Sequence, residues 1–164
     1  MNTIIAYMTR HGATAECARL LAEKLNGPAE LIDIAADRAK AITVPFQRVI
    51  LGFPIYGGDV IQSREIKDFM LSNFQDMMRK RVGLYVCGLQ EGPRSLEQLY
   101  KAFPEPLLKK SVAVDNFGGR IIRSQLGLWE RLKLSSVTNV TTDHSTISLE
   151  RIQAFADQMN RTDY

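Results

Sequence analysis

The chain has 164 residues, of which 45% are hydrophobic and 24% charged, and its formal net charge at pH 7 is +3. This length favours a single domain over residues 1–164, and the composition excludes a disordered or fibrous chain. No apolar run approaches the about 20 residues of a membrane span, and no signal peptide, nucleic-acid motif or cysteine metal spacing is present. The two cysteines suggest a reducing, cytoplasmic compartment.

Short apolar runs alternate along the chain with apolar residues at helical spacing. The runs predict five strands, at Thr3–Met8, Glu30–Ile34, Arg48–Gly52, Val82–Cys87 and Ser111–Val114. The helical spacing predicts helices at Ala15–Asn26, Ile66–Phe74, Ser95–Phe103 and Leu149–Met159, the last of them capped by Ser148. Pro45 argues against a helix in the second connection. This alternation predicts a doubly wound parallel α/β sheet with helices on both faces, whose ligand lies at the carboxyl ends of the strands.

The stretch Thr9–Thr14 follows the first predicted strand and opens the first predicted helix. Free N–H groups at a helix start, together with the helix dipole, attract an anion, and Gly12 lets the backbone approach it closely. The hydroxyls of Thr9 and Thr14 add donors, so the turn favours a phosphate monoester over an ordinary capped turn. For Arg10 and His11, a contact with the phosphate and a place on the open surface remain alternatives.

Three further strand ends carry glycines where the ligand of such a sheet would lie, namely Gly52–Asp59, Cys87–Pro93 and Asn116–Arg120. In the first of these, Tyr56 can stack on a flat heteroaromatic ring, and Gly57-Gly58 can change peptide orientation at low steric cost. Cys87 is interpreted as a small buried hydrophobe rather than a redox thiol.

Together these loops resemble those of the flavodoxin superfamily, over nearly the whole chain. The resemblance implies a five-stranded parallel sheet of order 2-1-3-4-5 and one bound FMN, with no metal and no side chain acting as acid or base. The implied phosphate-holding residues are Thr9, Arg10, His11, Gly12, Ala13 and Thr14. The implied ring-contacting residues are Pro54, Ile55, Tyr56, Gly57, Gly58, Cys87, Gly88, Leu89 and Gly92.

The form of the first loop and the segment after the fifth strand also resemble the short branch that includes menaquinone-dependent protoporphyrinogen IX dehydrogenase. The expected function is therefore electron transfer through a non-covalent flavin. The alternatives are a protoporphyrinogen dehydrogenase, a quinone reductase and a non-catalytic binding domain. Expected partners are a redox protein, a quinone or a flat anionic molecule, with possible peripheral membrane contact and no nucleic acid.

The segment after the fifth predicted strand is basic and partly apolar. Leu126–Leu134 predicts a short helix that packs on the sheet edge, although Trp129 could instead border a substrate site. The positive charges of this segment are expected near the edge of the flavin ring and favour an anionic partner. They belong to Arg120, Arg123, Arg131 and Lys133. A phosphorylated receiver domain is excluded because Phe53-Pro54 stands where that class needs a carboxylate.

Overall fold

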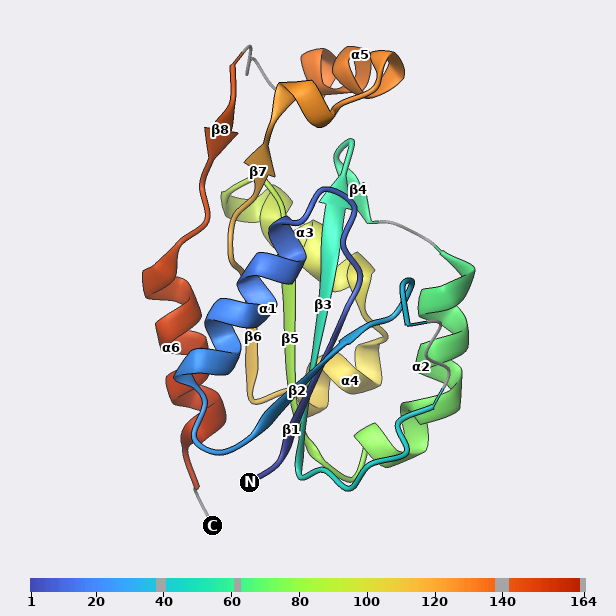
Figure 1. Cartoon of the computed structure of the whole chain (residues 1–164), viewed down its shortest axis with the longest axis vertical. Coiled ribbons are helices and arrows are strands. Elements are labelled where there is room, and N and C mark those ends of the chain that lie inside the picture. Colours follow the sequence, from blue (N-terminus) through green and yellow to red (C-terminus); the bar gives the residue numbers. More distant parts are fainter. Residues whose placement is uncertain (38–40, 61–62, 138–141, 163–164) are drawn as a thin grey trace.

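The computed structural model describes residues 1–37, 41–60, 63–137 and 142–162. Its main sheet contains five parallel strands, which confirms the predicted α/β class (Figure 1). The strands lie in the order β2 (Ala29–Asp33), β1 (Thr3–Tyr7), β3 (Arg48–Tyr56), β5 (Arg81–Cys87) and β6 (Ala113–Asn116). Counted over these parallel strands along the chain, this is the expected order 2-1-3-4-5.

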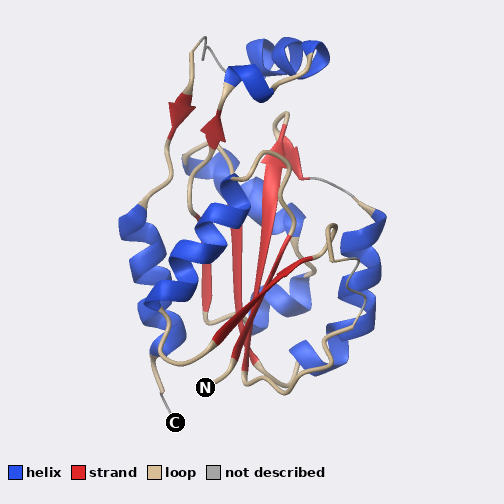
Figure 2. Cartoon of the chain, viewed as in Figure 1, coloured by secondary structure: helices blue, strands red, loops and turns tan. Residues whose placement is uncertain are grey.

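Helices cover both faces of the sheet, as Figure 2 shows. One face carries α1 (Ala13–Lys24) and α6 (Leu149–Asn160), and the other carries α2 (Arg64–Met77), α3 (Gly92–Ala102) and α4 (Glu105–Lys110). Because alternate residues of a strand point to opposite faces, Ile4 packs in the core under α2 whereas Ile5 packs in the core under α1. None of the described helices is both long enough and apolar enough to cross a bilayer.

Most predicted elements are present, with shifted ends. Helices α1 and α3 begin at Ala13 and Gly92, before their predicted starts, and α4 was not predicted. Residues 34–37 and 41–47, which follow β2, form no helix. Ser148 accepts a hydrogen bond from the Arg151 N–H, so it caps α6 as predicted.

Strand β3 extends to Tyr56, whereas the predicted strand ends at Gly52. Phe53 and Pro54 pair with the last two residues of β5, and a proline is tolerated there because the ladder ends. Beyond Tyr56 the chain reverses into the short strand β4 (Asp59–Val60), which pairs antiparallel with the end of β3. The predicted glycine loop is therefore a hairpin that projects past the sheet.

The segment between β6 and α6 lies beyond the carboxyl ends of the strands, at the top of Figure 1. It contains β7 (Arg120–Ile121), a 3-10 helix (Arg123–Gln125), α5 (Leu128–Val137) and β8 (His144–Ser145), which pairs with β7. The helix expected within Leu126–Leu134 is present as α5, but it does not pack on the sheet edge. Its Glu130 instead contacts the loop after β1.

Candidate functional site

A cavity opens at the carboxyl ends of β1, β3 and β5, the edge at which the sequence predicts a ligand. The space between its lining residues is about 850 Å³, counting volume that is open to solvent. Every predicted cofactor residue except Gly12 and Gly92 lines it. The lining residues that were not predicted to contact the cofactor are Gln90, Gln98, Gly119, Arg120, Ile121, Leu126 and Glu130.

The two exceptions lie close by. Gly12 is the residue before α1 and has a φ of 91°, a left-handed conformation that favours glycine. Gly92 begins α3 and lines a neighbouring hollow that shares Gly88, Leu89 and Gln90 with the cavity. Gly92 therefore lines this neighbouring hollow and not the cavity itself.

The first loop presents the uncapped start of α1 to the cavity. The Thr9 hydroxyl oxygen accepts a hydrogen bond from the Gly12 N–H at 2.9 Å, which closes the turn before the helix. Gly12 has no side chain to cap α1, in contrast to Ser63 at α2 and Ser148 at α6. The first N–H groups of α1 therefore need an outside partner, and an anion at this end would also interact favourably with the helix dipole.

Tyr85 supports this loop from inside the protein. It is fully buried on β5, packs against Gly52 of β3, and its hydroxyl donates to the Thr14 carbonyl at 3.1 Å. Burial raises the pKa of Tyr85 well above its usual value, so the hydroxyl stays protonated and remains a donor. Thr14 itself is buried and lines the cavity. The first turn of α1 is thus held in place by a strand of the sheet.

Arg120 lines the cavity beside the first loop. Its guanidinium forms an ion pair with Glu16 of α1. Its Nη2 atom lies 3.4 Å from the point that a Cβ would occupy on Gly12. Of the other expected cations, Arg123 and Arg131 lie in the segment beyond the sheet, and the Lys133 side chain is outside the described part of the chain. A positive charge and a helix start therefore share one end of the cavity.

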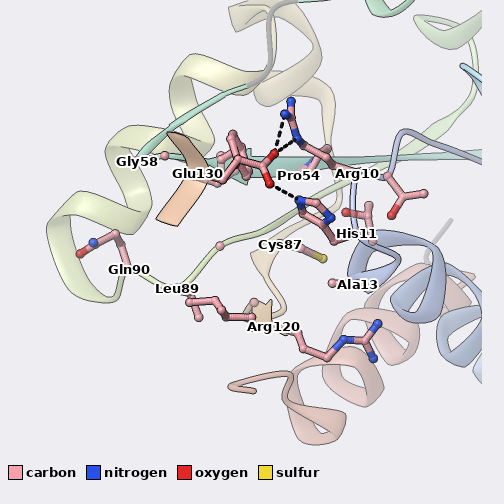
Figure 3. A pocket seen from close by; sticks show the side chains of 18 of the residues that line it. Arg10, His11, Ala13, Pro54, Gly58, Cys87, Leu89, Gln90, Arg120 and Glu130 are labelled. Atoms are coloured by element: carbon pink, nitrogen blue, oxygen red, sulfur yellow. Dashed lines mark hydrogen bonds and ion pairs between the residues drawn. The ribbon is translucent and has the colours of Figure 1, made fainter. Parts of the chain in front are cut away.

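Arg10 and His11 face a protein carboxylate, as Figure 3 shows. Glu130 Oε1 accepts hydrogen bonds from Arg10 Nε at 3.0 Å and from Nη2 at 2.6 Å. Glu130 Oε2 accepts from the Gly127 N–H at 2.8 Å and lies 3.6 Å from His11 Nε2. In this structure the Arg10 guanidinium therefore forms an ion pair within the chain.

The environment of Glu130 keeps its side chain ionised. Burial alone would raise the pKa of Glu130. The Gly127 N–H, the Tyr56 hydroxyl and the Arg10 guanidinium outweigh burial and lower this pKa to about 2. Sequence reasoning missed Glu130, because Arg10 and His11 lie more than a hundred residues earlier in the chain.

Tyr56 offers less ring surface to a ligand than its sequence position suggests. The Arg10 guanidinium carbon lies 4.2 Å from the centre of the ring, in cation–π geometry. Burial and the Glu130 carboxylate raise the pKa of Tyr56 to about 12, so the phenol is neutral at ordinary pH. Since Arg10 covers one face, a flat ligand can use only the other face or the edge.

The remaining walls come from the glycine loops. The Gly88 N–H donates to the Asn116 side chain at 3.1 Å, which ties the loop after β5 to the end of β6. Cys87 is buried, and its hydrogen bond with Cys17 and its burial raise the pKa of its thiol well above the usual value. Cys87 is therefore buried, as interpreted from the sequence, and both cysteines are free.

Comparison with known proteins agrees with this fold. The sequence profile of a family described as "Flavodoxin domain" matches residues 4–148, and no curated protein matches the chain. Similar solved structures include a flavodoxin of Streptococcus pneumoniae TIGR4 (TM-score 0.53, 17% identity, 97% of each chain covered). Flavodoxin 1 of Bacillus cereus has a TM-score of 0.52 at 16% identity, covering 86% of this chain and 100% of that one.

Flavodoxin 2 of the same organism has a TM-score of 0.51 at 16% identity, covering 96% of this chain and 97% of that one. At these identities the structures show a shared fold alone. The profile match, by contrast, spans most of the sequence, from the first strand to the start of the last helix. This chain belongs to the flavodoxin domain family.

Proposed function

We propose that the cavity binds FMN and that the protein carries electrons through this flavin. One observation carries the proposal: the uncapped start of α1 and the Arg120 guanidinium stand at one end of a cavity whose other walls are glycine loops and a tyrosine. FMN combines a phosphate monoester with a flat ring, and it would supply the redox chemistry, taking up electrons together with a proton at ring atom N5.

The residues present fit this cofactor in two groups. The first-turn N–H groups of α1, the Thr14 hydroxyl and Arg120 would hold the phosphate. The hairpin residues Tyr56–Gly58 and the loop Gly88-Leu89 would contact the ring. In this arrangement Arg10 acts indirectly, because it holds Glu130 and covers Tyr56.

An absorption spectrum of the purified protein tests the proposal most directly, since bound flavin absorbs in the visible range. Apo-protein should then be titrated with FMN, riboflavin and FAD. FMN should bind tightest, because riboflavin lacks the phosphate and the cavity has no second nucleotide motif. Equal affinity for riboflavin would contradict a phosphate site at α1. No binding of any flavin would favour the alternative of a non-catalytic binding domain.

A second candidate function is suggested by α5. Three of its large apolar side chains are exposed: Leu128 is 73% exposed, Trp129 78% and Leu132 56%. Leu126, just before α5, lines the cavity itself. An apolar surface at the cavity entrance suits a flat apolar substrate such as a quinone, or a protoporphyrinogen, and peripheral contact with a membrane.

This second candidate is tested by the acceptor that reoxidises the reduced flavoprotein. A quinone reductase should react faster with a soluble quinone than with a protein acceptor, and Trp129→Gln should lower that preference. A protoporphyrinogen dehydrogenase should in addition oxidise protoporphyrinogen with flavin reduction. Equal rates for wild type and variant would leave simple electron transfer to a protein partner as the function.

A further inference from the structure

Gln98 of α3 is buried in the wall of the cavity and has an incompletely satisfied side chain. It is 4% exposed, and its Nε2 donates to the Gly58 carbonyl at 2.8 Å. Its Oε1 is buried and has no hydrogen-bond partner among the described residues. A carbonyl can only accept a hydrogen bond, so the amide nitrogen must be the atom that faces Gly58.

The unpaired Oε1 atom argues that Gln98 is not present for its packing alone. A buried amide oxygen without a donor is unfavourable, and a leucine of similar size would fill the space without that cost. Packing therefore does not account for an amide at this position. Its distinctive contribution is the N–H group that holds the Gly58 carbonyl.

The turn that Gln98 holds has little other support. Tyr56 pairs with Asp59, so Gly57 and Gly58 alone form the hairpin loop. Their φ values of 58° and 84° are those of a type I′ turn, which both glycines adopt without strain. Among the residues that the structure describes, the partner strand β4 contributes two paired residues. A two-residue glycine turn on so short a ladder would change its peptide orientation readily without an external bond.

We propose that Gln98 is a positioning residue that fixes the Gly58 carbonyl against α3, so that only the Gly57 carbonyl remains to accept a hydrogen bond from the reduced ring. This inference rests on the proposed binding of FMN, because the N–H group at ring atom N5 would donate the hydrogen bond to Gly57. The peptide between Gly57 and Gly58 is then free to rotate while the next peptide stays in place. Gln98 sets the position of the acceptor without touching the ring itself.

Two variants separate the hydrogen bond from the packing. Gln98→Leu removes the donor and keeps the volume, so it should fold with at least wild-type stability. In Gln98→Glu, a carboxyl oxygen faces the Gly58 carbonyl. This oxygen can donate a hydrogen bond only when the carboxyl is protonated. Its hydrogen bond should therefore be absent at high pH and recovered at low pH. Gln158→Glu is the control, since it adds a carboxyl to an exposed residue whose carbonyl contacts Arg81 at the opposite end of β5.

The first measurement uses the apo-protein. The carbonyl carbon shift of Gly58 and the exchange protection of the turn amides report on the turn without a cofactor. Gln98→Leu should move the shift and lower the protection about tenfold, the factor that corresponds to one net hydrogen bond. Because burial at this position should raise the pKa of a carboxyl, Gln98→Glu should do so at pH 8 and return toward wild type at pH 5. Gln158→Glu should match wild type at both.

The second measurement uses FMN-loaded protein. Loss of positioning should weaken the hydrogen bond to the reduced ring, so the equilibrium between the two one-electron reduction steps should shift about tenfold in Gln98→Leu. The proposal would be overturned if Gln98→Leu folds but leaves the Gly58 carbonyl shift unchanged. It would also be overturned if the Gly58 shift and the turn protection of Gln98→Glu do not change with pH. A wild-type protein that binds no FMN would overturn the proposed function instead, while the apo-protein result would still stand.

Discussion

The carboxylate of Glu130 on α5 accepts two hydrogen bonds from the guanidinium of Arg10 in the loop after β1, across 120 positions of sequence. The same carboxylate receives the Gly127 N–H at the start of α5. One side chain therefore joins the segment beyond the sheet to the wall of the cavity. Leu128, Trp129 and Leu132 of α5 are left exposed, and Trp129 is the only tryptophan of the protein.

Replacement of Glu130 by glutamine should release α5 from the first loop. A neutral amide is a weaker acceptor for Arg10, so the fluorescence anisotropy of Trp129, the adjacent residue, should fall. The free energy of unfolding should drop by less than about 1 kcal/mol, because half-exposed ion pairs contribute little. Glu97→Gln removes an exposed pair with Lys101 and serves as control. Equal anisotropy in the wild type and Glu130→Gln would show that α5 is held by other contacts.

The same contact predicts a transition at acid pH. The folded-state pKa of Glu130 is lowered from the usual 4.5 to about 2. The stability that it contributes is therefore fully present above pH 4.5 and is lost as the pH falls through about 2. Trp129 anisotropy should be constant between pH 5 and 8 and should decrease below pH 4. In Glu130→Gln this acid step should be absent; a step of the same size there would assign it to another group.

Thr14→Val should weaken FMN binding by about 1–3 kcal/mol, the cost of leaving a hydrogen bond to a charged group unmade. Thr14 is 1% exposed, and valine has nearly its shape, so the fold should be preserved. Calorimetric titration with FMN and with riboflavin provides the comparison. A parallel loss for both ligands would indicate damage to the loop rather than the loss of a phosphate contact.

Arg120→Gln should also weaken FMN binding, roughly 10- to 100-fold, because a charge-assisted hydrogen bond to the phosphate is lost. Riboflavin affinity should be unchanged. The matched control is Arg123→Gln, three residues along on the 3-10 helix and outside the residues that line the cavity. The dependence of FMN affinity on salt should be shallower in Arg120→Gln than in the control. If Arg120→Gln and Arg123→Gln change the FMN affinity and its salt dependence equally, Arg120 acts only as a general surface charge.

The first loop shows what could be predicted from sequence and why. A strand, a glycine turn and a helix start are contiguous, so Thr9–Thr14 indicates an anion site through local geometry alone. Short apolar runs likewise located the five parallel strands, because the strands of a sheet covered on both faces are buried on both sides. The strand order then agreed with the family resemblance. The extension of β3 was missed because Pro54 lies within it and Gly57-Gly58 follow it directly, a pattern typical of a loop.

By itself, then, the sequence determined the fold class, the sheet edge that carries the cavity and most of its lining, since each depends on neighbours in the chain. Only the tertiary structure decided the pairing of Arg10 with Glu130, the place of Arg120 beside Gly12, and the bond from Gln98 to Gly58. Those contacts join segments at least 40 residues apart. A charged or amide side chain in a sequence carries no mark of its partner, and only the folded backbone brings the two within hydrogen-bond distance.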